Sequence, residues 1–164
     1  MNFHKIFFLL IFSFSIVSCG SDDDICTSGE GTPRMKVKFK ATDGKIKTLD
    51  SLFVSVEYKD GEITHLQPNN SSSVFLNVDS VFVPLRVDEN GFTNIYFRTS
   101  KIGDSSKLKV NYTTKTEYVS PACGMKKLYE NLDASVENPN PILNVEINQT
   151  EILNEDKTHL YLIF

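Results

Sequence analysis

Three cysteines carry most of the reactive chemistry in this sequence, and they stand far apart. Cys19 follows a long apolar run near the start, Cys26 follows an acidic stretch, and Cys123 lies in the sequence SPACGM. A cysteine acts as a nucleophile when a basic partner lowers the pKa of its thiol. His65 and His159 are the available bases beyond the first residues. A reactive thiol at Cys123 is therefore one open interpretation.

The first eighteen residues have the pattern of a secretory signal peptide. His4 and Lys5 precede the run IFFLLIFSFSIV, which contains no charged side chain. This run is shorter than the 18 or so apolar residues that a membrane-spanning helix needs, and it matches the apolar region of a signal peptide. A buried core helix is the alternative, although residues 7–12 leave no polar face. We therefore expect residues 1–18 to be removed.

The end of this run resembles the lipobox of bacterial lipoproteins. Ile16 and Val17 are followed by the small residue Ser18 and then by Cys19. In such proteins the cysteine thiol receives a diacylglycerol, the chain is cut before it, and the new amino group is acylated. The resemblance implies that acylated Cys19 binds membrane lipid, where each buried methylene contributes about 0.8 kcal/mol. An ordinary secretory signal with a chance cysteine is the alternative.

An acidic tract follows this cysteine, with Ser21, Asp22, Asp23 and Asp24 after a glycine. It resembles the export signal of Bacteroidetes-type lipoproteins, which directs them to the outer face of the outer membrane. The resemblance implies a lipid-anchored protein that faces the cell exterior. A periplasmic face is the alternative, because like charges also extend a solvated tether.

The remaining cysteines form an even pair once Cys19 is assigned to the lipid. In an oxidising compartment, the default expectation for Cys26 and Cys123 is a disulfide. It would tie the tether to a distant part of the domain. The reactive thiol at Cys123 remains the alternative.

Length and charge limit the organisation and the partners. The 164 residues carry a formal net charge of −4. This acidic balance argues against nucleic-acid binding, which needs a basic surface, and against electrostatic docking on anionic lipid. We expect a signal at residues 1–18, a lipidated tether at 19–33 and one domain at 34–164.

Alternation of apolar and polar residues dominates that domain. RMKVKFKA, at residues 34–41, has the period of two that is typical of a strand with one buried face. The sequence DG within KDGE favours a hairpin turn after residues 52–58, and Pro84 favours an edge position for its strand. Further strands are expected at 63–66, 73–78, 80–87, 93–99, 107–115, 117–120, 142–153 and 158–164. One or two helical turns are expected at 124–132. This pattern predicts an all-β antiparallel β-sandwich of immunoglobulin-like architecture, with a barrel as the alternative.

Several short motifs lie along the chain after the signal. They are Cys26 before the first strand, Thr32-Pro33, Val83-Pro84-Leu85, LKVNY at 108–112, VSPACG at 119–124 and a terminal β-hairpin. This arrangement resembles a family of small Bacteroidetes lipoproteins of unknown function. The family carries no established activity or catalytic residues, so the resemblance transfers no function.

Two tripeptides look like the Asp-Ser/Thr-aliphatic sites of O-glycosylation in exported proteins of that phylum. They are DSL at 50–52 and DSV at 79–81. The likeness marks Ser51 and Ser80 as candidate modification sites. Matches of three residues also arise by chance.

The sequence contains no pattern of an enzyme site. His65 and His159 are expected at the surface or at an interface, and the acids are spread over turns. No His, Cys and Asp cluster has metal-binding spacing, so we expect no catalytic residue, metal or cofactor. The hypothesis is a non-enzymatic structural or accessory protein with an unknown envelope protein as partner. A binding module for extracellular glycan or peptide, through Tyr58, Tyr96 or Tyr118, is the alternative.

Overall fold

The computed structural model describes residues 31–59, 61–68, 72–121 and 123–164. Their regular structure is entirely β, which confirms the predicted fold class, and none of them lies in a helix able to cross a bilayer. The strands are β1 (Met35–Lys40), β2 (Leu49–Lys59), β3 (Glu62–His65), β4 (Phe75–Val78), β5 (Ser80–Val83), β6 (Phe92–Arg98), β7 (Ser106–Ser120), β8 (Gly124–Val136), β9 (Asn144–Ile147) and β10 (Leu160–Ile163).

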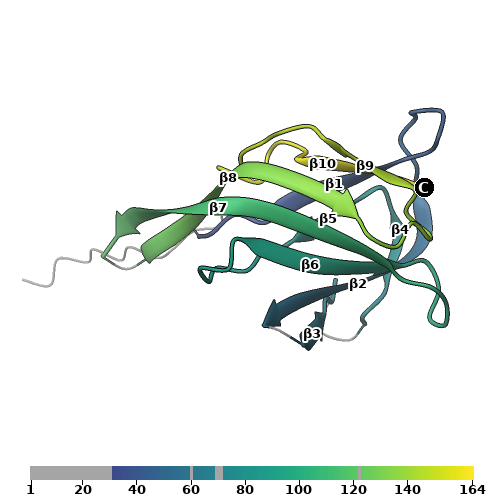
Figure 1. Cartoon of the computed structure of the whole chain (residues 1–164), viewed down its shortest axis with the longest axis horizontal. Helices are drawn as coiled ribbons and strands as arrows, with labels where there is room; N and C mark the ends of the chain where they lie inside the picture. The colour runs from purple at the N-terminus through teal and green to yellow at the C-terminus, as the bar shows by residue number, and fades with distance from the viewer. Residues whose placement is uncertain (1–30, 60, 69–71, 122) are drawn as a thin grey trace, which may run out of the picture.

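These strands form two sheets that pack face to face as a β-sandwich (Figure 1). The smaller sheet has the order β5-β1-β10-β9, and the larger has the order β3-β2-β6-β7-β8, with β4 also paired to β2. All of these neighbours are antiparallel except β1 and β10, which are parallel. The predicted antiparallel sandwich is therefore confirmed. It contains one parallel pair, because the last strand, β10, lies between β1 and β9 and runs in the same direction as β1.

Alternation in the sequence places the core between the sheets. In β1 the side chains of Met35, Val37 and Phe39 are buried, and the three lysines that alternate with them lie on the outer face. Strands β2 and β6 contribute their own inward side chains to the same core, such as Val54 and Phe97. Each fully buried side chain of this size stabilises the fold by about 1.5–3 kcal/mol.

The predicted helical turns at residues 124–132 are wrong. This segment is the first part of β8, which pairs with β7 from Leu108↔Val136 to Ser120↔Gly124. Good helix formers such as Lys126, Lys127 and Leu128 are held extended by the ladder to β7, because long-range pairing overrides a weak local propensity.

Other boundaries also differ from the sequence-based expectations. Residues 117–120 belong to β7 rather than to a separate strand. The long strand expected at 142–153 is limited to β9, and Ile152 forms an isolated bridge to Tyr129. The edge position expected from Pro84 is confirmed, since β5 ends at Val83 and borders only β1 in its sheet.

Candidate binding groove

Several residues singled out in the sequence lie outside the described residues. They are Cys19, Cys26 and the tract Ser21–Asp24, so lipidation, export and the Cys26–Cys123 pairing stay predictions. Cys123 is described, and it lies between β7 and β8, where its backbone N–H donates to the Ser120 hydroxyl at 3.1 Å.

One contact places the end of the predicted tether. The backbone N–H of Lys127 in β8 donates to the Thr32 hydroxyl at 2.9 Å. Thr32 is six residues after Cys26, and Lys127 is four residues after Cys123. Six extended residues reach at most about 20 Å, so this contact leaves Cys26 within chain reach of Cys123.

The two candidate glycosylation serines are half-buried and hydrogen-bonded. The Ser51 hydroxyl donates to the carbonyl oxygen of Thr99 at 2.6 Å. The Ser80 hydroxyl donates to the Asp79 carboxylate at 2.8 Å. A glycan attached to either hydroxyl oxygen would remove the hydrogen that the serine donates, so the hydrogen bond would be lost. Modification at both positions stays a prediction.

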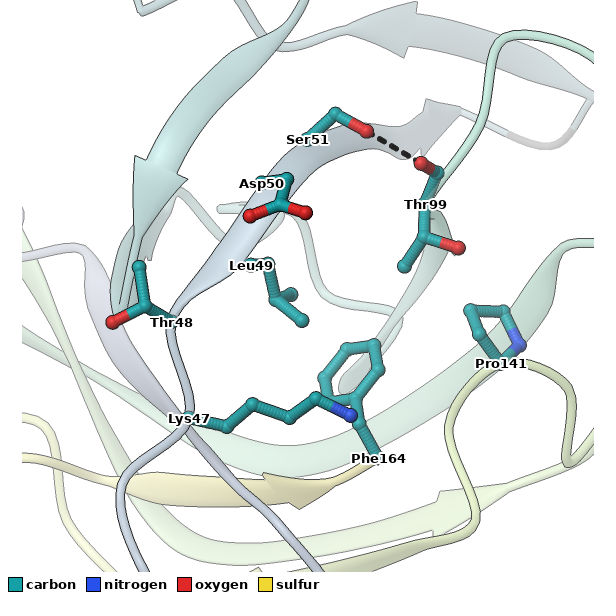
Figure 2. A pocket seen from close by; sticks show the side chains of 8 residues that line it. All are labelled: Lys47, Thr48, Leu49, Asp50, Ser51, Thr99, Pro141 and Phe164. Atoms are coloured by element: carbon teal, nitrogen blue, oxygen red, sulfur yellow. Dashed lines mark hydrogen bonds between the residues drawn. The ribbon is translucent and has the colours of Figure 1, made fainter.

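An open groove of about 350 Å³ lies at one end of the sandwich and is lined by charged, hydroxyl and apolar side chains (Figure 2). We call it the distal groove. Topology assembles it from the segment leading into β2, the end of β6, the loop before β9 and the end of β10. Its lining residues are Lys47, Thr48, Leu49, Asp50, Ser51, Thr99, Pro141 and Phe164.

An aromatic ring forms part of the floor of the distal groove. The Phe164 ring packs edge-on against the buried Phe39 ring, with centroids 5.5 Å apart and planes at 79°. The Phe164 backbone N–H also donates to the carbonyl oxygen of Lys40 at 2.9 Å. The ring is thus held in place by the core, and together with buried Leu49 it gives the groove an apolar base.

Two opposite charges border this apolar base. The Lys47 ammonium lies 5.8 Å from the centroid of the Phe164 ring, and Asp50 is exposed, with Leu49 between the two in Figure 2. Neither side chain forms an ion pair with another residue that the structure describes. Both charges are therefore available to a ligand.

A second cavity of about 340 Å³ lies beside the edge strand β5. Its charged lining residue, Arg34, forms hydrogen bonds of 2.8 and 2.7 Å with the Glu155 carboxylate. These bonds raise the pKa of Arg34 and lower the pKa of Glu155. The positive charge is already balanced within the protein, so this cavity offers a ligand less than the distal groove does.

Ser55 and His65 form a contact outside these cavities. The sequence did not suggest this pair. Ser55 Oγ lies 2.7 Å from Nδ1 of His65 across the β2–β3 ladder. Such a pair resembles the nucleophile and base of a hydrolase. Among the described residues no carboxylate contacts His65 to orient its ring, and Ser55 is only 5 % exposed. The pair therefore ties β3 to β2 and does not form a triad.

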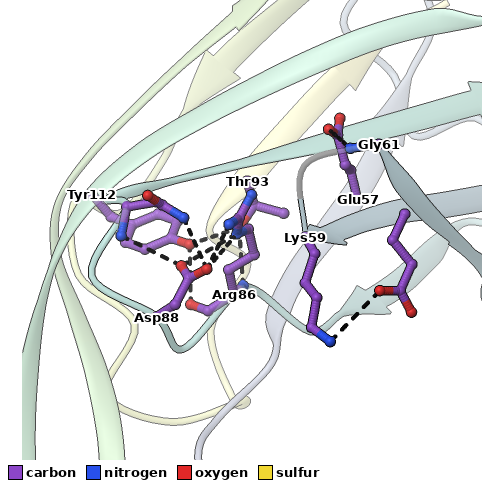
Figure 3. A network of polar contacts seen from close by, with 9 residues as sticks. Glu57, Lys59, Gly61, Arg86, Asp88, Thr93 and Tyr112 are labelled. Carbon is purple, nitrogen blue, oxygen red and sulfur yellow. Dashed lines mark hydrogen bonds and ion pairs between the residues drawn. The ribbon is translucent and has the colours of Figure 1, made fainter.

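Polar groups beside this pair are also tied to one another. The Glu57 carboxylate accepts hydrogen bonds from the Gly61 backbone N–H at 2.9 Å (Figure 3), from the Asn94 amide at 3.0 Å and from the Tyr96 hydroxyl at 3.1 Å. These donors, with the backbone N–H of Gly61 foremost, lower the pKa of Glu57. Tyr96 is thus engaged within the sheet face, which weakens the sequence-based idea that it stacks on a sugar.

A buried polar cluster joins β6 and β7 to the segment between β5 and β6 (Figure 3). The Tyr112 hydroxyl donates to the Arg86 carbonyl oxygen at 3.0 Å and lies 2.6 Å from the Thr93 hydroxyl. The buried Arg86 guanidinium pairs with the Asp88 carboxylate, and this bond lowers the pKa of Asp88. These groups satisfy one another, so the cluster holds the fold together.

The two histidines have different surroundings. His65 is exposed, as expected for a surface residue. The expectation of a surface or interface position for His159 is wrong, because it is 1 % exposed and its Nδ1 accepts a hydrogen bond from the Lys36 backbone N–H at 2.9 Å. Burial lowers the pKa of His159. Within the described residues no three His, Cys, Asp or Glu side chains gather as metal ligands.

The fold and the distal groove together define a small all-β domain of sandwich type with an open, charged groove at one end. A family model matches residues 51–164, more than half of the chain, and describes a family of unknown function, DUF6452. The chain belongs to this family. No curated protein and no solved structure matches the chain.

Proposed function

We propose that this protein is a lipid-anchored outer-membrane lipoprotein that faces the cell exterior and serves as a non-enzymatic accessory subunit for a protein partner. The proposed cellular location is supported by the apolar run, the lipobox-like residues ending in Cys19, and the acidic tract Ser21–Asp24. The family match supports the part of the resemblance that concerns an uncharacterised family, and the lipoprotein character remains part of this proposal.

The distal groove carries the proposal for the partner. It combines the Lys47 ammonium and the Asp50 carboxylate, which form no ion pair with the residues that the structure describes, with the apolar surface of Leu49 and Phe164. A volume of about 350 Å³ is within the range of ligand sites and suits a few side chains of a polypeptide segment. A segment carrying an acidic, an apolar and a basic side chain would match all three parts of the groove.

An extracellular glycan is the second candidate, and Phe164 is the observation that favours it. Sugars bind by stacking on aromatic rings and by hydrogen bonds to carboxylates and hydroxyls, which Asp50 and Thr48 supply. The Lys47 ammonium, however, lies near the Phe164 ring and competes with a sugar for that surface. A polypeptide segment of the protein partner is therefore the favoured ligand.

We also propose that Cys26 and Cys123 form a disulfide. The contact between Thr32 and Lys127 supports it, because this contact brings the tether to the strand that begins just after Cys123. The bond would fasten the tether to the β7–β8 hairpin.

In-cell photocrosslinking tests the partner proposal. A photoreactive amino acid at Thr48, which is exposed and lines the groove, should give a protein adduct in the full chain. The adduct should weaken several-fold in Lys47→Ala and Asp50→Asn. Lys45→Ala is the matched control, because Lys45 is exposed near the groove and pairs with Asp43.

Two outcomes would contradict this partner site. One is an adduct no stronger at Thr48 than at exposed Thr116 on the β7–β8 hairpin. The other is an adduct that Lys47→Ala and Asp50→Asn leave unchanged. Binding of the domain to a glycan array, lost in Phe164→Ala, would favour the glycan instead.

Separate experiments test the lipid anchor and the side of the membrane on which the domain lies. Labelled palmitate should enter the protein and should fail to enter Cys19→Ala. Protease added to intact cells should remove a tag on the domain if it faces the exterior. Protection of that tag, with the label still present, would favour the periplasmic face.

A further inference from the structure

We propose that the tip of the β7–β8 hairpin rests on the surface of the bilayer and orients the domain, with the cross-strand pair Tyr118 and Met125 as the contact. This inference rests on the proposed lipid anchor. It adds an interaction surface and an orientation that the anchor alone does not provide.

The hairpin extends beyond the rest of the sandwich. Strand β6 pairs with β7 only along Ser106–Asn111, whereas β8 continues to pair with β7 as far as Ser120. Residues 115–118 of the outer part of β7 are exposed. Figure 1 shows the paired ends of β7 and β8 projecting from one end of the molecule.

Two large apolar side chains lie opposite each other near this tip. Tyr118 pairs with Met125 across the ladder, and the two are 60 % and 62 % exposed. Tyrosine favours the boundary between lipid and water, because its ring is apolar and its hydroxyl is polar. Methionine is flexible and adapts to an irregular apolar surface.

The tether enters the domain beside this hairpin. Thr32 accepts the hydrogen bond of Lys127, which is two residues from Met125. Thr32 is thirteen positions after Cys19, and a flexible chain of this length spans about 20 Å on average and at most about 45 Å. An anchor at Cys19 therefore keeps the hairpin end of the domain near the bilayer.

The remaining charges near the tip favour a contact that depends on apolar surface. The Lys126 ammonium is 3.2 Å from the Glu117 carboxylate, and the Lys127 ammonium is 3.7 Å from the Glu89 carboxylate. Two of the lysines on the hairpin are thus already paired, so the contact needs no anionic lipid. Zwitterionic phospholipid vesicles are therefore a suitable probe, because they test the apolar contact without a charged surface.

In this orientation the distal groove is accessible to a partner outside the membrane. Phe164, which lines the groove, is at the end of the chain marked C, opposite the hairpin tip in Figure 1. A domain that rests on its hairpin tip therefore presents the groove away from the membrane.

Methionine oxidation provides a direct test. After removal of the signal the chain keeps two methionines, buried Met35 and exposed Met125. The acylated protein, reconstituted in zwitterionic vesicles, is treated with chloramine-T, a charged oxidant, and the methionine sulfoxide at each position is followed by mass spectrometry. The same chain beginning at Gly20, mixed with the same vesicles, is the control.

Met125 should be oxidised at least threefold more slowly in the vesicle-bound protein than in the control. Met35 should be slow in both. The protection should not change when the protein-to-lipid ratio is lowered tenfold. In Tyr118→Ser the protein should still float with the vesicles, but Met125 should regain its reactivity. The matched control Ile102→Ser removes another exposed apolar side chain, 91 % exposed, and should keep the protection.

The outcomes separate the orientation from the anchor. Vesicle-bound protein in which Met125 stays as reactive as in the control overturns the orientation and leaves the anchor intact. Protection that disappears on dilution in the bilayer shows contact between copies and also overturns it. Protein that fails to float overturns the anchor and the orientation together.

Discussion

The Tyr112 and Thr93 hydroxyl oxygens lie 2.6 Å apart in the buried cluster between β6 and β7. Because the Tyr112 hydroxyl donates to the Arg86 carbonyl and the Thr93 oxygen accepts from the Arg86 backbone N–H, the Thr93 hydroxyl donates to Tyr112. Tyr112→Phe leaves the buried Arg86 carbonyl and the Thr93 hydroxyl without this partner. We expect it to lower the free energy of unfolding by about 1–3 kcal/mol in urea titrations.

Tyr161→Phe is the matched control for this change. Tyr161 is half-buried, and its ring lies under the Lys40 ammonium at 3.8 Å. A change within about 0.5 kcal/mol is expected there. Equal losses in both variants would show that the Tyr112 hydroxyl has no special role.

The same tyrosine should make stability depend on alkaline pH. Burial raises the pKa of Tyr112 to about 12, against about 10 in an unfolded chain. Between these values the unfolded chain loses the proton and the folded protein keeps it, so the free energy of unfolding falls as pH rises from 10 to 12. Burial also raises the pKa of Tyr129, so Tyr112→Phe should reduce this fall without abolishing it. A wild-type stability that is flat over this range would contradict the prediction.

His159 should set the dependence on mildly acidic pH. Burial lowers its pKa below the usual 6.5, so the unfolded chain takes up a proton before the folded protein does. The stability is therefore complete above pH 6.5 and falls as pH drops below it towards the folded pKa. His159→Asn keeps an acceptor for the Lys36 N–H and removes the titration. Denaturant titrations from pH 7 to 5 should show a flatter profile for this variant, and an unchanged slope would assign the effect to other groups.

Gly91 occupies a turn where a side chain meets two obstacles. Its φ is +70°, and an added Cβ would lie 3.2 Å from the carbonyl oxygen of Tyr112. The left-handed backbone alone costs a non-glycine residue about 1–2 kcal/mol. Gly91→Ala should lower the free energy of unfolding by more than this. Gly44→Ala is the matched control, because Gly44 has a φ of +81° and no neighbour within 4 Å of its Cβ.

The strands that the sequence predicts best are those that combine alternation with a clear turn. β1 and the β2–β3 hairpin have both signals, and the structure confirms them. The first half of β8 has neither signal in its own residues, because its extended form depends on the ladder to β7. Local pattern cannot reveal a pairing whose partner supplies most of the stabilisation.

The distal groove could be predicted only in part. Lys47 to Ser51 are contiguous, but Thr99, Pro141 and Phe164 join them through the order of the strands. The Ser55–His65 pair cannot be predicted from the sequence for a related reason. A two-residue turn with regular pairing from Lys59↔Glu62 would place Leu66 opposite Ser55, and the irregularity between Glu57 and Lys59 moves His65 there instead.

The proposed disulfide between Cys26 and Cys123 should contribute strongly to stability. A bond that closes a loop of about 100 residues stabilises a protein by roughly 4–5 kcal/mol in the chain-entropy estimate, and measured values are often lower. Cys26→Ser and Cys123→Ser should therefore each lower the free energy of unfolding by about 2–5 kcal/mol.

The free energy of unfolding of the double variant distinguishes a disulfide bond from two independent packing effects. If the two sulfurs form one bond, Cys26→Ser with Cys123→Ser should be no less stable than either single variant, because the second change removes nothing further. Losses that add would mean that each cysteine acts alone. Non-reducing mass spectrometry should find a peptide containing Cys26 linked to one containing Cys123. Free thiols at both positions in protein isolated from the cell envelope would rule the bond out and reopen the question of a reactive Cys123.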